Sequence, residues 1–137
     1  MERPTSRPAS RPTVLVIEDD RPTSDLLRDV VEAAGLRFVP ANEGHLAMSI
    51  AVDERPQVIT LDLGLPDTDG HAVLHRLLAD ERTRHIPIVV VTGYRRYLPA
   101  DDYDRLAAVV DKPFDVADLS RVLRDLAGAE QRVGSGR

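Results

Sequence analysis

The chain alternates short apolar runs with longer segments in which apolar residues recur every three or four positions. The apolar runs are rich in β-branched residues and predict strands at 14–17, 37–41, 58–61, 86–91 and 107–110. Helical spacing predicts helices over about 23–34, 43–53, 70–80 and 115–126, with a short fourth helix between Pro99 and residue 107. This alternation is typical of βα units that form a parallel sheet.

The run at 58–61, VITL, is apolar on both faces, which suits the centre of a parallel sheet. It delivers one carboxylate, Asp62, into a loop that Gly64, Pro66 and Gly70 turn away from the sheet. A buried carboxylate at such a position is costly unless something pairs with it. The carboxyl edge of an open α/β sheet is also where ligands bind, so we expect the rest of the site to surround Asp62.

Composition excludes several classes of protein. With 137 residues, 42% hydrophobic and 30% charged, the chain fits one ordinary globular domain. No apolar run approaches the roughly 18 residues of a membrane span. The absence of cysteine excludes a disulfide framework and a thiolate metal site. A formal net charge of -5 argues against direct DNA binding. Because the N-terminus lacks an apolar signal core and no apolar run is long enough to span a membrane, we expect a cytoplasmic protein that does not bind a membrane.

Three segments differ in character along the chain. Residues 1–13 repeat Arg-Pro among Ser and Thr and predict a disordered arm. We expect residues 14–128 to form the folded domain and the polar residues 129–137 to form a flexible tail. We expect no helix-turn-helix or catalytic module after residue 128, and therefore no direct control of transcription.

Polar side chains follow four of the predicted strands at the point where each strand ends. Glu18 and Asp19 follow the first strand, Asp62 the third, Thr92 the fourth and Lys112 the fifth. Right-handed crossovers bring these ends to one edge of a parallel sheet. Carboxylates crowded there repel one another unless a cation intervenes, and Mg²⁺ prefers such oxygen ligands. The pattern therefore predicts a site that holds a phosphoryl group against Asp62, with Lys112 and Thr92 binding its oxygens.

In their order and spacing these residues resemble the receiver domain of two-component response regulators, over about residues 13–128. The resemblance rests on the acidic cluster after the first strand, Asp62 with Pro66 and Gly70 beyond it, Thr92, and the run Lys-Pro-Phe at 112–114. It implies a flavodoxin-like, doubly wound α/β fold with a five-stranded parallel sheet in the order 2-1-3-4-5.

The resemblance also implies a role for each site residue. Asp62 is the phosphoacceptor, and Thr92 and Lys112 bind the phosphoryl oxygens. The Mg²⁺ ligands are Glu18, Asp19, Asp62 and the backbone carbonyl of Gly64, with Asp19 as a direct ligand. The Lys112–Pro113 peptide bond is expected to be cis.

The implied function is that of a single-domain response regulator. Such a protein accepts a phosphoryl group from a histidine kinase or phosphotransfer protein and signals by contact with a downstream protein. It is not an enzyme in the ordinary sense, and we expect a monomer or weak homodimer. Two alternatives stay open: a phosphorelay carrier or phosphate sink, and a binding module that acts without phosphorylation. The complete set of site residues argues against the binding module.

Three features depart from the usual receiver pattern. Val109 stands where the family commonly has an aromatic switch residue, the segment from Thr92 to Lys112 is short, and Gly64 replaces a bulkier residue, which should open the site to water or to a partner's side chain. Because Val109 has no ring to turn, we expect phosphorylation to reorder residues 93–105 and the turn after Asp62, while Val109 and the last helix barely respond. The remaining acids and the histidines are expected to be capping or surface residues: Asp20, Asp67, Asp69, Asp111, His45, His71, His75 and His85.

Overall fold

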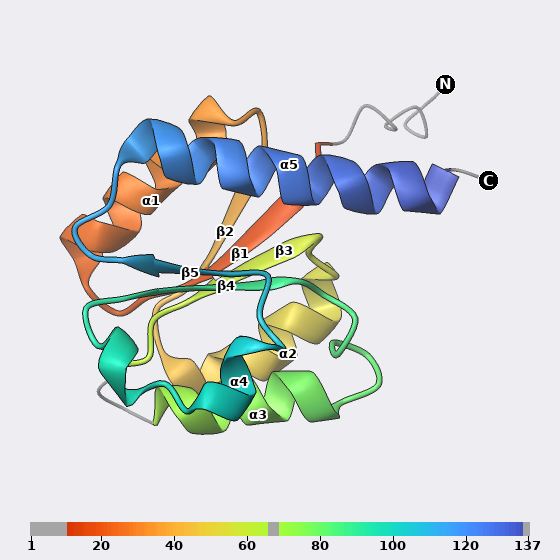
Figure 1. The fold of residues 1–137 in the computed structure, drawn as a ribbon. Helices are drawn as coiled ribbons and strands as arrows, with labels where there is room; N and C mark the ends of the chain where they lie inside the picture. Colours follow the sequence, from red (N-terminus) through yellow and green to blue (C-terminus); the bar gives the residue numbers. More distant parts are fainter. Residues whose placement is uncertain (1–10, 66–68, 136–137) are drawn as a thin grey trace.

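The computed structural model describes residues 11–65 and 69–135, which contain alternating strands and helices (Figure 1). In order they are β1 (Thr13–Ile17), α1 (Arg21–Ala33), β2 (Arg37–Ala41), α2 (Gly44–Glu54), β3 (Val58–Leu61), α3 (Gly70–Ala79), β4 (Ile88–Thr92), the 3₁₀ turn η2 (Arg95–Tyr97), α4 (Ala100–Tyr103), β5 (Ala108–Asp111) and α5 (Val116–Ser135). Nearly all of the predicted arm, with Pro66 and Asp67, lies outside the described residues.

The five strands form one parallel sheet in the order β2-β1-β3-β4-β5, which confirms the predicted fold class. β3 lies at the centre, and all of its residues are buried, as its apolar sequence predicts. Ile17 is in register with Leu61, and Thr92 with Asp111. The carboxyl ends of these strands therefore meet at one edge of the sheet.

Two layers of helices cover the sheet (Figure 1): α1 and α5 lie on one face, and α2, α3 and α4 on the other. Successive residues of β1 point to opposite faces. Leu15 and Ile17 join the core beneath α2 and α3, whereas Val14 and Val16 join the core beneath α1 and α5. No helix in the described ranges is both long and apolar enough to cross a membrane.

The helix bounds differ from prediction at both ends of the chain. α1 begins at Arg21 because the Asp20 side chain caps it, accepting a hydrogen bond from the backbone N–H of Thr23. α5 continues to Ser135, although we expected the last helix to end near Leu126 and a tail to follow. The segment beyond Leu126 contains no proline, and the two glycines that lie within the helix, Gly128 and Gly134, cost only about 1 kcal/mol each relative to alanine, so neither ends it.

Candidate functional site

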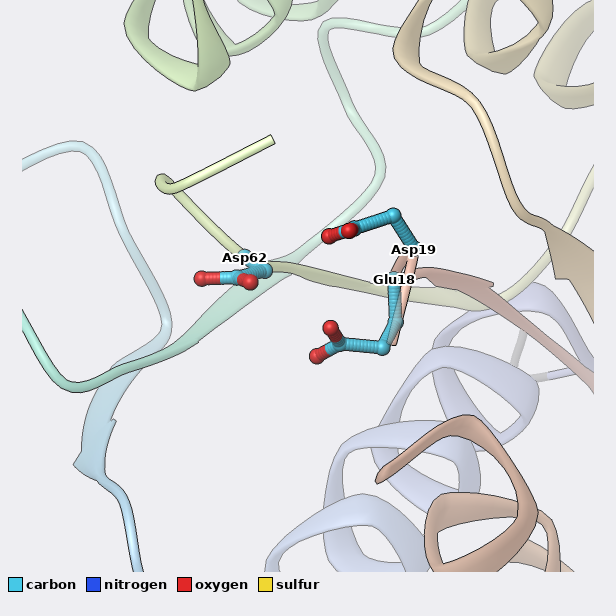
Figure 2. Close-up of side chains that lie close together, drawn as sticks. All are labelled: Glu18, Asp19 and Asp62. Atoms are coloured by element: carbon cyan, nitrogen blue, oxygen red, sulfur yellow. The ribbon is translucent and has the colours of Figure 1, made fainter. Parts of the chain in front are cut away.

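Three carboxylates predicted to form the site come together at the carboxyl edge of the sheet (Figure 2). Glu18 and Asp19 follow β1, and Asp62 follows β3. One oxygen from each lies within 4.8 Å of the others, close enough for a single cation. Glu18 and Asp62 are buried and Asp19 is exposed, so the cluster opens toward solvent on the side of Asp19. The donor set fits a hard divalent cation such as Mg²⁺.

Lys112 is the protein's own cation in this cluster. Its Nζ atom donates to Oε1 of Glu18 at 2.8 Å and to Oδ2 of Asp62 at 3.2 Å. Burial by itself lowers the pKa of Lys112, but the bonds to the two carboxylates outweigh burial and raise it. Burial raises the pKa of Glu18 in spite of the bond from Lys112. The Lys112–Pro113 peptide bond is cis, as expected.

The second oxygen of each buried carboxylate accepts a backbone N–H. Oδ1 of Asp62 accepts from Gly64 at 3.1 Å, and Oε2 of Glu18 accepts from Asp20 at 3.1 Å. The N–H of Asp62 in turn donates to the carbonyl of Ile17 at 3.1 Å. These bonds hold the two carboxylates in fixed positions beside Lys112. The role of the Gly64 carbonyl as a metal ligand stays a prediction.

Thr92, at the end of β4, is fully buried. Its hydroxyl oxygen accepts a hydrogen bond from the backbone N–H of Tyr94 at 3.0 Å and so closes the turn that follows β4. The structure thus places Thr92 in the first turn of the loop that borders the Asp62 cleft. Its contact with a phosphoryl oxygen stays a prediction.

Tyr94 is a residue of the site that the sequence did not reveal. A methyl group added at Gly64 would lie 3.1 Å from Cε2 of Tyr94, so the tyrosine ring fills the space above this glycine. Gly64 is expected to open the site to water or to a partner's side chain, and in the structure the ring of Tyr94 takes up part of that space. Both residues line the cleft that also contains Glu18, Asp19, Asp20, Thr23, Asp62, Gly93 and Lys112.

The other acids have structural partners. Asp20 caps α1, and its hydrogen bonds from Thr23 lower its pKa. Asp69 caps α3 by accepting from the N–H of His71 at 3.0 Å. Both are therefore capping acids, as predicted. Asp111 accepts from Arg95, a contact that the sequence did not reveal.

His75 is a surface residue, as predicted, but it also has a partner that the sequence did not reveal. Its side chain is 52% exposed, but its Nε2 atom lies 3.1 Å from Oδ2 of Asp102, whose side chain is only 6% exposed. This pair joins α3 to the short α4. A contact between residues 27 positions apart leaves no local pattern in the sequence.

Known proteins with similar sequences support the interpretation of this site. Residues 14–124 match the model of the response regulator receiver domain. The transcriptional regulator RpaA of a Synechocystis species is 35% identical over 130 residues, which cover 89% of this chain but only 52% of RpaA. The polar-differentiation response regulator DivK of Brucella anthropi is 29% identical over 121 residues, covering 85% of this chain and 96% of DivK.

A solved structure agrees with these sequence matches. The crystal structure of a sensor protein from Polaromonas sp. JS666 superposes with a TM-score of 0.80 and 28% identity, covering 88% of this chain and 98% of that one. The family match, the strand order and the clustered carboxylates at the sheet edge agree with one another. The chain therefore belongs to the response regulator receiver domain family of two-component signalling.

Proposed function

We propose that the protein accepts a phosphoryl group on Asp62 from a histidine kinase or a phosphotransfer protein. The observation that carries this proposal is the Lys112 ammonium between the buried carboxylates of Glu18 and Asp62. A cation held this close to an acceptor carboxylate is ready to bind the charge that phosphorylation adds. The family match supports the same role.

The transfer needs few groups from this chain. A carboxylate oxygen of Asp62 forms the new O–P bond while the N–P bond to the donor histidine breaks. The histidine nitrogen keeps the bonding pair and takes up a proton. The product carries about -1.5 to -2 charges at pH 7, so Lys112 moves from the carboxylate to a phosphoryl oxygen. The Thr92 hydroxyl, at the neighbouring strand end, donates to another.

Glu18, Asp19 and Asp62 would hold Mg²⁺, with the Gly64 carbonyl as a further ligand. Both carboxylate oxygens of Glu18 already accept hydrogen bonds, from Lys112 and from the Asp20 N–H. Glu18 would therefore contribute to Mg²⁺ binding mainly through its negative charge. Asp19 is exposed and is the natural direct ligand. When bound, Mg²⁺ neutralises charge between the acceptor carboxylate and the incoming phosphoryl group.

The output we propose is a changed contact with a downstream protein in the cytoplasm. Phosphorylation changes charge at the sheet edge, and the loop after β4 begins at that edge with Thr92 and Tyr94. A charge change next to a loop of this kind alters the surface that the loop presents to a partner.

The decisive experiment exposes the protein to acetyl phosphate and Mg²⁺ and follows its intact mass. The parent should gain one phosphoryl group, and peptide mapping should place it on Asp62. Asp62→Asn should abolish the gain, whereas Asp101→Asn, at an exposed acid of α4, should not change it. A phosphoryl group that still attaches to the Asp62→Asn variant would show that another residue is the acceptor.

A further inference from the structure

Arg95 makes a second polar cluster close to the phosphoacceptor site. Its Nε atom donates to Oδ1 of Asp111 at 2.9 Å, and its Nη2 atom donates to the backbone carbonyl of Val109 at 2.9 Å. Asp111 and, less strongly, Tyr103 of α4 raise the pKa of Arg95. One side chain of η2 therefore joins this turn to β5 through two hydrogen bonds.

The position of Arg95 in the chain gives these contacts their meaning. Arg95 is the third residue after Thr92, and Asp111 directly precedes Lys112. The ion pair thus connects the two chain segments that carry the proposed phosphoryl ligands. It also covers β5, which is an edge strand of the sheet.

Thr92 and Arg95 are coupled through a single turn. In this structure the Thr92 hydroxyl accepts from the N–H of Tyr94, the residue immediately before Arg95. If the side chain of Thr92 rotates so that its hydroxyl can donate to a phosphoryl group, its oxygen moves away from the Tyr94 N–H, that bond is lost, and the turn is free to move. Movement of this turn displaces Arg95, which directly follows Tyr94 in the chain.

The contacts of Arg95 are weak enough to be broken by such a movement. The side chains of Arg95 and Asp111 are 41% and 60% exposed, and an ion pair this exposed contributes little stability. The planar guanidinium, however, needs one orientation to donate to Asp111 and Val109 together. A small shift of η2 therefore removes both bonds at once.

We propose that Arg95 is a latch that holds the loop after β4 against β5 until Asp62 is phosphorylated. This inference rests on the proposed function. The side chain of Val109 has no aromatic ring that could turn. In the latch, the backbone carbonyl of Val109 takes part instead, by accepting a hydrogen bond from Arg95. Release of the latch frees the Val109 carbonyl, the Asp111 carboxylate and the Arg95 guanidinium, and so changes both hydrogen bonding and charge along β5.

The test uses the whole chain with Mg²⁺ and fluoroberyllate as the phosphoryl mimic. In the parent, the mimic should shift the Arg95 Nε–H resonance toward that of a solvated arginine and speed hydrogen exchange at the Tyr94 amide. Arg95→Gln should exchange a few-fold faster than the parent across residues 93–103 without the mimic, as expected for the loss of an exposed ion pair. Asp111→Asn should act in the same direction.

Two controls make the result specific. Arg105→Gln, at an exposed arginine that follows α4, should behave like the parent. Arg95→Lys keeps the charge but lacks the planar fork, so it should not restore slow exchange. All variants should still bind one fluoroberyllate, as measured by fluorine NMR.

The outcomes separate the latch from the function on which it rests. If the parent binds no fluoroberyllate, the proposed function fails and the latch fails with it. If the mimic binds but the Arg95 resonance and the exchange of residues 93–103 stay unchanged, the latch alone is wrong. Slow exchange in Arg95→Gln without the mimic would also overturn it.

Discussion

The ammonium of Lys112 lies 2.8 Å from Oε1 of Glu18, a residue that is only 1% exposed. A buried carboxylate that loses its cation keeps the cost of desolvation without the compensating bond. Lys112 therefore stabilises the fold as well as serving the proposed chemistry.

The first prediction follows from this pair. Lys112→Met should lower the free energy of unfolding by about 2 kcal/mol, because Glu18 and Asp62 lose their cation. Urea unfolding measures the change. Addition of MgCl₂ should recover part of it and should stabilise the variant more than the parent. The double variant Lys112→Met/Glu18→Gln should be more stable than Lys112→Met. Equal stability of parent and Lys112→Met would contradict the argument.

The second prediction separates two adjacent acids that look alike in the sequence. Asp19→Ala should weaken Mg²⁺ binding by roughly tenfold or more, because it removes an anionic ligand. Asp20→Ala should leave Mg²⁺ affinity nearly unchanged but lower the melting temperature, because α1 loses its N-cap. Calorimetric titration and thermal unfolding of both variants test this crossed pattern. Similar losses of Mg²⁺ affinity in the two variants would show that Asp20 belongs to the metal site.

The third prediction concerns the ring of Tyr94 above Gly64. Tyr94→Ala should open the cleft, so that both phosphorylation by acetyl phosphate and spontaneous loss of the phosphoryl group become several-fold faster. Tyr94→Phe keeps the ring and should therefore stay much closer to the parent in both rates than Tyr94→Ala does. Stopped-flow phosphorylation followed by chase with excess chelator gives both rates. If Tyr94→Ala changes neither rate, the ring does not limit access to Asp62.

The sequence predicted the fold and the carboxylates that meet at the carboxyl edge of the sheet because their signals are local. The apolar run that ends in Asp62 is contiguous, and the strand ends that carry Glu18, Thr92 and Lys112 are each marked by a change from apolar to polar residues. Parallel topology then places these ends together. Each of these predictions depended only on a short segment of sequence and on the rule that crossovers between parallel strands are right-handed.

The contacts that the sequence did not reveal are long-range and involve side chains on irregular segments. Arg95 and Asp111 are 16 positions apart, and His75 and Asp102 are 27 apart. Neither pair has a helical or strand spacing that would suggest contact. The position of the Tyr94 ring likewise depends on how two separate loops pack, so no local pattern shows that it covers Gly64.

The fourth prediction uses a hydroxyl at the centre of the sheet. Within the described residues, Thr60 Oγ1 is the buried side-chain oxygen that lacks a hydrogen-bond partner. Thr60→Val has nearly the same shape and removes the cost of desolvating that hydroxyl, so it should raise the free energy of unfolding by about 1 kcal/mol.

Thr83→Val is the matched control for this change. Thr83 is equally buried, but its hydroxyl donates to the carbonyl of Leu77 at 2.7 Å. Loss of that bond leaves a buried acceptor unpaired, so Thr83→Val should destabilise the protein by about 1–2 kcal/mol. Chemical unfolding of both variants should therefore give changes of opposite sign. Changes of the same sign would show that the Thr60 hydroxyl is satisfied in solution.

The fifth prediction concerns the acid side of the stability profile. Asp80, which ends α3, accepts from Nε and Nη2 of Arg82 at 2.9 and 2.8 Å and from the Arg82 backbone N–H at 2.8 Å. These bonds, first the side-chain ones and then the backbone one, lower the pKa of Asp80 to about 2. The pKa of Asp80 is about 4 in the unfolded chain. The stabilising effect is therefore complete above about pH 4 and is lost as the pH falls through the folded value near 2.

Thermal unfolding of the parent and Asp80→Asn from pH 6 to pH 2 measures this dependence. The parent should have the higher melting temperature at pH 6, and the difference should shrink as the pH falls below about 4, because protonated Asp80 resembles asparagine. Arg82→Gln keeps the carboxylate and the backbone N–H bond of residue 82 but removes the guanidinium, so the Asp80 carboxyl carbon should titrate at a higher pH in that variant than in the parent, where it titrates near pH 2. A difference in melting temperature that grows toward low pH has the wrong sign and would refute the assignment of Arg82 as the group that holds Asp80 ionised.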